Sequence, residues 1–286
     1  MLFAAITCSS RARPAILRLA AYSATRRIVS ASIPVPNDVS MERPEAVALV
    51  ESEIYRDSWA ESASRFFPGA GMHFTQVDLF SNQLREKNKR SAPTLGKLEQ
   101  TLAQDLSSTA YGYCIVIARG PIQCLLSQYF VESLPLAGLV LVDPLLLPDD
   151  GRINQPGVGC AQTRWSSSLS DLVSILDRSS ANSPMRNSSQ ITDDMQSEQN
   201  EIHLIRSLKI DKGRALKLEP QAVPTLVMYS GGHEYEDHFR ICAERTASFH
   251  TSVADGDFFD QVPVVKVKDD APHMQTILDW YDESAT

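Results

Sequence analysis

The chain has 286 residues, of which 43% are hydrophobic and 22% charged, and its formal net charge is −8. This composition is typical of a globular protein with a sizeable core, and no apolar run approaches the roughly 20 residues of a membrane-spanning helix. The acidic balance argues against a general nucleic-acid-binding surface. Because the five cysteines show no CxxC spacing, we expect neither a zinc site nor a disulfide framework, and we expect no cofactor.

Residues 1–35 differ in composition from the rest of the chain. They are rich in Ala and Ser, have no lysine or acidic residue, and carry five arginines: Arg11, Arg13, Arg18, Arg26 and Arg27. This pattern is typical of a mitochondrial transit peptide, with a plastid address and a tail without a targeting role as alternatives. We therefore expect a matrix protein whose folded domain spans residues 40–286.

Beyond this segment, short apolar runs alternate with segments of helical spacing. The runs that predict strands are 46–50, 72–79, 113–118, 136–142, 225–229 and 262–267. The predicted helices are 58–67, 95–106, 122–133, 238–249 and 274–281. Several runs are apolar throughout, as in strands covered on both faces. The alternation predicts an α/β fold with a doubly wound, mainly parallel sheet.

The stretch 148–220 interrupts this alternation. Its centre, 179–200, is dense in Ser, Asn, Gln and Asp, which favours a mobile loop. The flanking segments 169–176 and 202–208 have helical apolar spacing. We interpret 148–220 as a lid insertion over the carboxyl edge of the sheet, where open α/β sheets bind ligands.

Four stretches carry a resemblance to a known family. They are PEAVALVESEIYRDSWAESASRFFPGAGMHFTQVDL, YCIVIARGPIQCLLSQYFVESLPLAGLVLVDP, VPTLVMYSGGHEYEDHF and VPVVKVKDDAPHMQTILDWYDE. In wording and order they resemble the α/β-hydrolase fold superfamily. The resemblance covers residues 44–283 without the insertion, and it implies a serine-hydrolase architecture.

At the nucleophile elbow the chain departs from this family. The family's Gly-x-Ser-x-Gly motif corresponds to Ala-Arg-Gly-Pro-Ile at residues 118–122. Gly120 holds the nucleophile position and has no side chain to form an acyl intermediate. Pro121 holds the next position, whose N–H normally belongs to the oxyanion hole, and proline has no N–H. The resemblance therefore implies that acyl-transfer chemistry has been lost.

The resemblance also implies positions for the other catalytic residues. His273 stands where the family keeps its base, and Glu234 where it keeps its acid. Asp143 is an alternative acid, or else it caps a turn with Pro144. Where the family usually has His-Gly after its first strand, this chain has Glu51 and Ser52.

Two further residues adjoin the elbow. Arg119 could bind a carboxylate or phosphate, although we favour an ion pair with Glu51, since an unpaired buried charge is costly. Cys124 follows one helical turn after Gly120, and we expect a buried thiol there.

These features lead to three hypotheses. The first is a pseudoenzyme, a non-catalytic hydrolase-like protein that serves mitochondria as an accessory or ligand-binding component. The second is a divergent active hydrolase of the esterase or thioesterase type that uses His273 and Glu234 without a serine nucleophile. The third is a small-molecule sensor. The expected partner is a protein or a small acyl or carboxylate ligand, and no nucleic acid.

Overall fold

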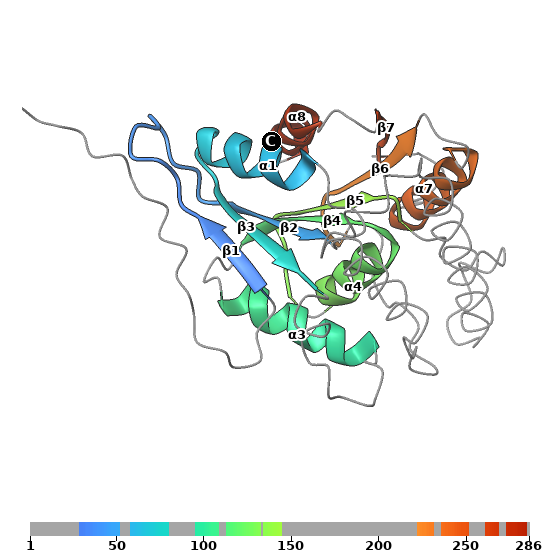
Figure 1. Ribbon diagram of the computed structural model, residues 1–286. Helices are drawn as coiled ribbons and strands as arrows, with labels where there is room; N and C mark the ends of the chain where they lie inside the picture. The colour runs from blue at the N-terminus through green and yellow to red at the C-terminus, as the bar shows by residue number, and fades with distance from the viewer. Residues whose placement is uncertain are drawn as a thin grey trace, which may run out of the picture.

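The structure is a computed structural model that describes residues 29–51, 58–79, 95–108, 113–132, 134–144, 222–231, 236–251, 261–268 and 273–284. In this part of the chain a seven-stranded sheet has the order β1-β3-β2-β4-β5-β6-β7 (Figure 1). The strands are β1 (Val29–Ile33), β2 (Ala46–Glu51), β3 (His73–Asp78), β4 (Cys114–Arg119), β5 (Gly138–Val142), β6 (Thr225–Gly231) and β7 (Val264–Lys268). The helices are α1 (Ser58–Gly69), α3 (Leu95–Ser108), α4 (Pro121–Val131), α7 (Glu236–His250) and α8 (Met274–Ser284).

The sheet is parallel from β3 to β7, and only β1 runs antiparallel to its neighbour β3. Every residue of β2, β4 and β5 is buried, which explains why these strands are apolar along their whole length rather than alternating. All the carboxyl ends of the parallel strands lie along one edge, the edge at which such sheets bind ligands.

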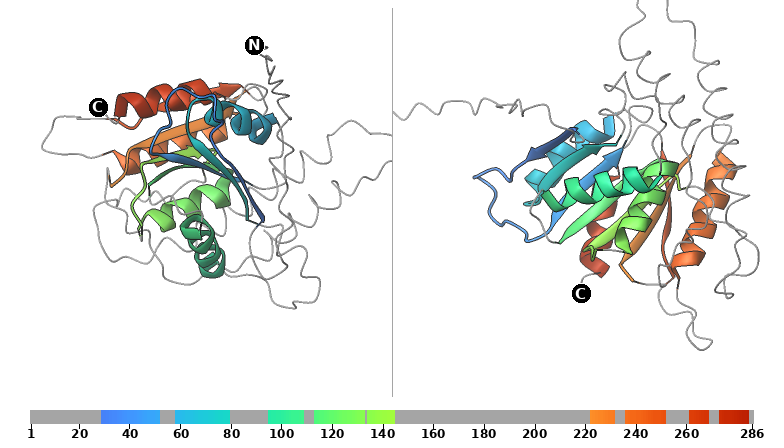
Figure 2. Two further views of the ribbon diagram at one scale, coloured as in Figure 1. Left: turned by 90° about the vertical axis from the view of Figure 1, so that its left-hand side faces the viewer. Right: turned by 90° about the horizontal axis from the view of Figure 1, so that it is seen from below.

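Helices cover both faces of the sheet (Figures 1 and 2). α1 and α8 pack on one face, where Trp59, Phe67 and Trp280 contact buried residues of the strands. α3 and α4 pack on the other face through residues such as Leu102 and Leu126, and α7 packs against β6. Among the described helices, none is long and apolar enough to cross a membrane.

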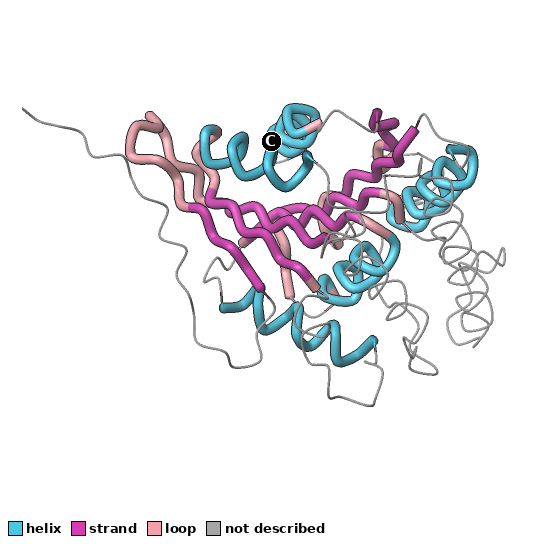
Figure 3. The backbone as a smooth tube through the Cα atoms, in the orientation of Figure 1, coloured by secondary structure: helices cyan, strands magenta, loops and turns pink. Residues whose placement is uncertain are grey.

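The expected fold class is confirmed, and the six predicted strands and five predicted helices match the structure within a few residues (Figure 3). β1 was not predicted, although the run Val-Ser-Ala-Ser-Ile alternates apolar and polar residues, because it falls inside the segment assigned to a transit peptide. The predicted lid, 148–220, with its two helices, lies outside the described residues.

The connection from β1 to β2 is fastened to the rest of the fold. The guanidinium of Arg43 donates to both carboxylate oxygens of Asp282 in α8, at 2.5 and 3.1 Å. The backbone N–H of Arg43 donates to the carbonyl of Gly71 at 2.7 Å. Glu42 pairs with His73 of β3 at 2.9 Å. These contacts join the connection to the segment before β3, to β3 itself and to the last helix.

Candidate functional site

The turn between β4 and α4 lies at the carboxyl edge of the sheet. Gly120 forms its apex with φ 102° and ψ 160°, and Pro121 is the first residue of α4. The N–H of Gly120 donates to the carbonyl of Val142 at 2.9 Å, and its carbonyl accepts from the N–H of Cys124 at 2.9 Å. Proline is favourable at the first position of a helix, because its N–H would have no helical partner there. The turn therefore has the sharp strand-to-helix course of a nucleophile elbow, with no side chain at its apex and no N–H at the next residue.

The thiol of Cys124 does not replace the missing nucleophile. The side chain is fully buried, and its Sγ–H donates to the carbonyls of Ala118 and Val142, both at 3.3 Å. Burial, and secondarily the charge of Asp143, raises the pKa of this thiol well above its usual value. Since the thiolate is the nucleophilic form, Cys124 is a packing residue, as predicted.

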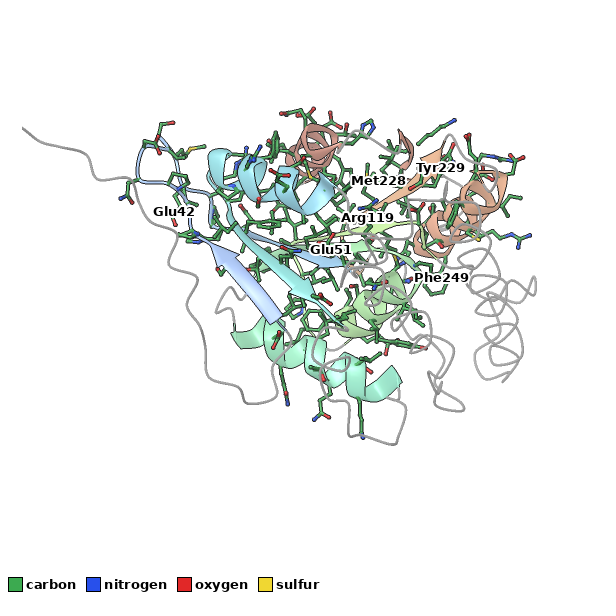
Figure 4. The ribbon with its side chains drawn as sticks, in the orientation of Figure 1. Glu42, Glu51, Arg119, Met228, Tyr229 and Phe249 are labelled. Carbon is green, nitrogen blue, oxygen red and sulfur yellow. The ribbon has the colours of Figure 1, made fainter. Side chains whose placement is uncertain are left out.

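Glu51 and Arg119 end neighbouring strands in matching register, because Val50 of β2 is paired with Ala118 of β4. Residues in register on parallel strands point to the same face of the sheet, here the face covered by α1. Both side chains are buried, with 3% of Glu51 and 7% of Arg119 exposed. Figure 4 shows the two residues on adjacent strands near the middle of the sheet.

Each of these charged groups also contacts a third residue. The guanidinium carbon of Arg119 lies 4.9 Å from the ring centroid of Trp59 in α1, a cation–π arrangement. An oxygen of the Glu51 carboxylate accepts a hydrogen bond of 2.7 Å from the side-chain amide of Gln76. The burial and the register agree with the ion pair that the sequence predicts between Glu51 and Arg119, and the pairing itself stays a prediction.

Asp143 binds the next strand of the sheet through its carboxylate, and the predicted turn cap with Pro144 stays a prediction. Its carboxylate accepts from the backbone N–H of Ser230 at 2.7 Å and from the Ser230 hydroxyl at 2.6 Å. Its own N–H donates to the carbonyl of Met228 at 3.0 Å, and its φ is 54°. Asp143 thus joins the end of β5 to β6. Both carboxylate oxygens are already bound to Ser230, which weakens the case for Asp143 as a catalytic acid.

His273 immediately precedes α8, and its carbonyl accepts from the N–H of Ile277 at 3.1 Å. Its Nε2 is buried, and within the described part of the chain it has no hydrogen-bond partner. His273 follows the last strand, as the resemblance implied. Glu234, the predicted acid, lies outside the described residues, so the predicted pairing of Glu234 with His273 stays a prediction.

A buried polar chain joins the elbow helix to α7. The ring Nε2 of His250 lies 3.0 Å from the side-chain oxygen of Gln128, whose amide donates to the carbonyl of Cys124 at 3.1 Å. Burial lowers the pKa of His250 to about 4, so the imidazole is neutral at physiological pH. These hydrogen bonds could not be predicted from the sequence, because Gln128 and His250 are 122 positions apart.

Solved structures share the overall fold of this chain. MenH from S. aureus has a TM-score of 0.53 at 10% identity, with 90% of this chain and 99% of that chain covered. A carboxylesterase structure from the thaumarchaeon Nitrososphaera gargenis has a TM-score of 0.50 at 8% identity, covering 88% and 92% of the two chains. These similar structures are α/β-hydrolase fold proteins. No protein-family model and no curated protein matches the sequence. The chain therefore has the α/β-hydrolase fold, and the likeness extends to the fold alone.

Proposed function

We propose that this protein uses the α/β-hydrolase fold without acyl-transfer chemistry, as a non-catalytic accessory or ligand-binding component of mitochondria. The observation that carries the proposal is the glycine at the apex of the elbow, followed by Pro121. Gly120 has φ 102° and ψ 160°, a region that is essentially reserved for glycine. Active hydrolases also place their nucleophile on a strained turn, so the loss rests on the residue at the apex, because glycine has no side chain that could attack an acyl group.

Two further features oppose ester hydrolysis. Pro121 leaves the turn without the N–H that would stabilise an oxyanion, and removing one such donor lowers kcat by roughly 10²–10³. The buried carboxylate of Glu51 stands at the end of β2, where the family's other oxyanion donors begin. A negative charge there would repel a developing oxyanion. The missing nucleophile, the missing oxyanion donor and the nearby carboxylate thus all disfavour ester hydrolysis.

The carboxyl edge retains groups that suit binding. Arg119, stacked on Trp59, is a cation within a largely apolar setting, and its guanidinium has five N–H donors, enough to hold a ligand carboxylate beside that of Glu51. A small acyl or carboxylate compound is therefore the ligand class that we propose. The mitochondrial address rests on the arginine-rich, acid-free composition of residues 1–35.

A divergent hydrolase is the second candidate, and His273 favours it. Its Nε2 is buried without a hydrogen-bond partner in the described part of the chain, and such a nitrogen could accept a proton from a positioned water. With Glu234 as its acid, His273 would act as a general base, and no covalent intermediate would form.

Hydrolysis of p-nitrophenyl acetate and longer p-nitrophenyl esters separates the two candidates. We expect the purified full chain and its His273→Ala variant to show the same background rate. A matched control is His73→Gln, since His73 is paired with Glu42 in an exposed position. Turnover that disappears in His273→Ala and persists in His73→Gln would establish the hydrolase instead. For the binding role, we expect medium-chain fatty acids to raise the melting temperature of the unmodified protein more than that of Arg119→Met.

A further inference from the structure

The amino-terminal edge of the sheet falls inside the segment that composition assigns to a transit peptide. All five residues of β1 pair with β3, from Val29 opposite Asp78 to Ile33 opposite Phe74. Ile33 also packs against the core beneath α1 and α8. β1 is therefore part of the folded sheet, and a transit peptide that extended to residue 35 would remove it.

The chain that follows β1 is equally part of the fold. The guanidinium of Arg43 is bound to Asp282 in α8, and Glu42 is bound to His73. The strand and its connection thus form one anchored unit. Loss of β1 would leave this connection in place and expose the unpaired backbone groups of β3.

The arginines of the leader end at nearly the same point. Arg26 and Arg27 are the last basic residues ahead of β1, and the next cation in the sequence is Arg43. The arginine-rich character therefore ends two residues before the strand begins. The acid-free composition itself continues to residue 37, so it is the arginines alone that end just ahead of the strand.

We propose that the transit peptide is removed by cleavage between Arg27 and Val29, so that β1 is the first element of the mature protein. The proposal rests on the proposed mitochondrial localisation. A matrix peptidase hydrolyses one peptide bond: water supplies a hydroxyl to the acyl carbon of the leader and a proton to the new amino terminus. Cleavage on the amino-terminal side of β1 leaves this edge strand of the sheet intact.

Import of the radiolabelled full chain into isolated mitochondria tests the inference, with an uncoupler as the control for potential-dependent import. Intact mass and amino-terminal sequencing of the protease-protected product are expected to give a terminus at Ile28 or Val29. The double variant Arg26→Ala with Arg27→Ala should reduce cleavage between residue 27 and Val29. The matched pair Arg11→Ala and Arg13→Ala should slow import and leave the cleavage position unchanged.

The two proposals fail in different ways. A mature terminus at or beyond residue 30 or ahead of Ile28, or import without cleavage, would overturn the cleavage site and leave the localisation standing. A chain that is neither imported nor cut would overturn the localisation, and the cleavage site with it.

Stability of the shortened chains gives a second measurement. We expect a chain that starts at Val29 to melt as the full chain does, and one that starts at Pro34 to melt on the order of 5 °C lower, because five cross-strand pairs are lost. Equal melting temperatures of the two shortened chains would contradict the role given to β1.

Discussion

Placing a serine at Gly120 tests whether the elbow is built for glycine. Gly120 is buried, with φ 102° and ψ 160°, and a side chain in such a region costs about 1–3 kcal/mol. The loss of glycine's freedom in the unfolded chain offsets about 0.4–1 kcal/mol of this. We therefore expect Gly120→Ser to destabilise the fold by about 1–2 kcal/mol, which lowers the melting temperature by about 2–8 °C.

Gly69 supplies a matched control for this substitution. It lies at the end of α1, and a Cβ added there would meet no atom within 4 Å. Since serine has a higher helix propensity than glycine, Gly69→Ser should leave the unfolding free energy within about 0.5 kcal/mol of the original value. Thermal and urea unfolding followed by circular dichroism would measure both variants. Equal stability of Gly120→Ser and Gly69→Ser would refute the strain argument.

The same variant tests the oxyanion argument. Gly120→Ser restores a hydroxyl but leaves Pro121 without an N–H, so we expect no gain in p-nitrophenyl acetate hydrolysis. The double variant Gly120→Ser with Pro121→Ala restores both groups, and it is the appropriate comparison at equal folded concentration. Substantial activity in the single variant would show that the N–H at residue 121 is dispensable.

Three further outcomes follow from buried groups. The unfolding free energy should fall by about 3 kcal/mol as the pH drops from about 6.5 to 4. The reason is that His250 stays neutral in the folded state down to its pKa of about 4, while the unfolded imidazole is protonated below about 6.5. Urea titrations at several pH values should show a flatter dependence of the unfolding free energy on pH for His250→Gln. Asp143→Ala should cost about 2–3 kcal/mol by removing both Ser230 hydrogen bonds, and Ser230→Ala should then add little in a double-mutant cycle. Iodoacetamide at pH 8 should leave Cys114 and Cys124 unlabelled in the native protein. Burial raises the pKa of Cys114 to about 11 and that of Cys124 well above its usual value. Peptide mass spectrometry would detect any modification.

The strands that could be predicted from sequence are those with the strongest local signal. The run Cys-Ile-Val-Ile-Ala is apolar throughout because β4 has neighbours on both sides and helices on both faces. β1 has one neighbour, and its alternating run Val-Ser-Ala-Ser-Ile is short, has Ser or Ala at three of five positions and lies in the segment assigned to a transit peptide. The adjacency of Glu51 and Arg119 could be anticipated once the order of β2 and β4 was assumed, since both residues end their strands.

Contacts between distant residues were beyond sequence analysis. Asp143 and Ser230 are separated by 87 positions, and neither residue type indicates the other. The carboxylate of Asp143 binds the half-buried N–H and hydroxyl of Ser230, and hydrogen bonds to a charged group are strong. Only the tertiary structure brings these two residues together.

The ion pair between Arg43 and Asp282 joins residues that are 239 positions apart. It closes only when the last helix has been synthesised, so a nascent chain on the ribosome cannot complete this side of the molecule. Contacts of such long sequence separation slow folding, because the loop they close costs entropy before they form. A polypeptide in which this contact waits for the synthesis of Asp282 has a longer interval in which chaperones can bind it and in which it can be threaded through a narrow pore.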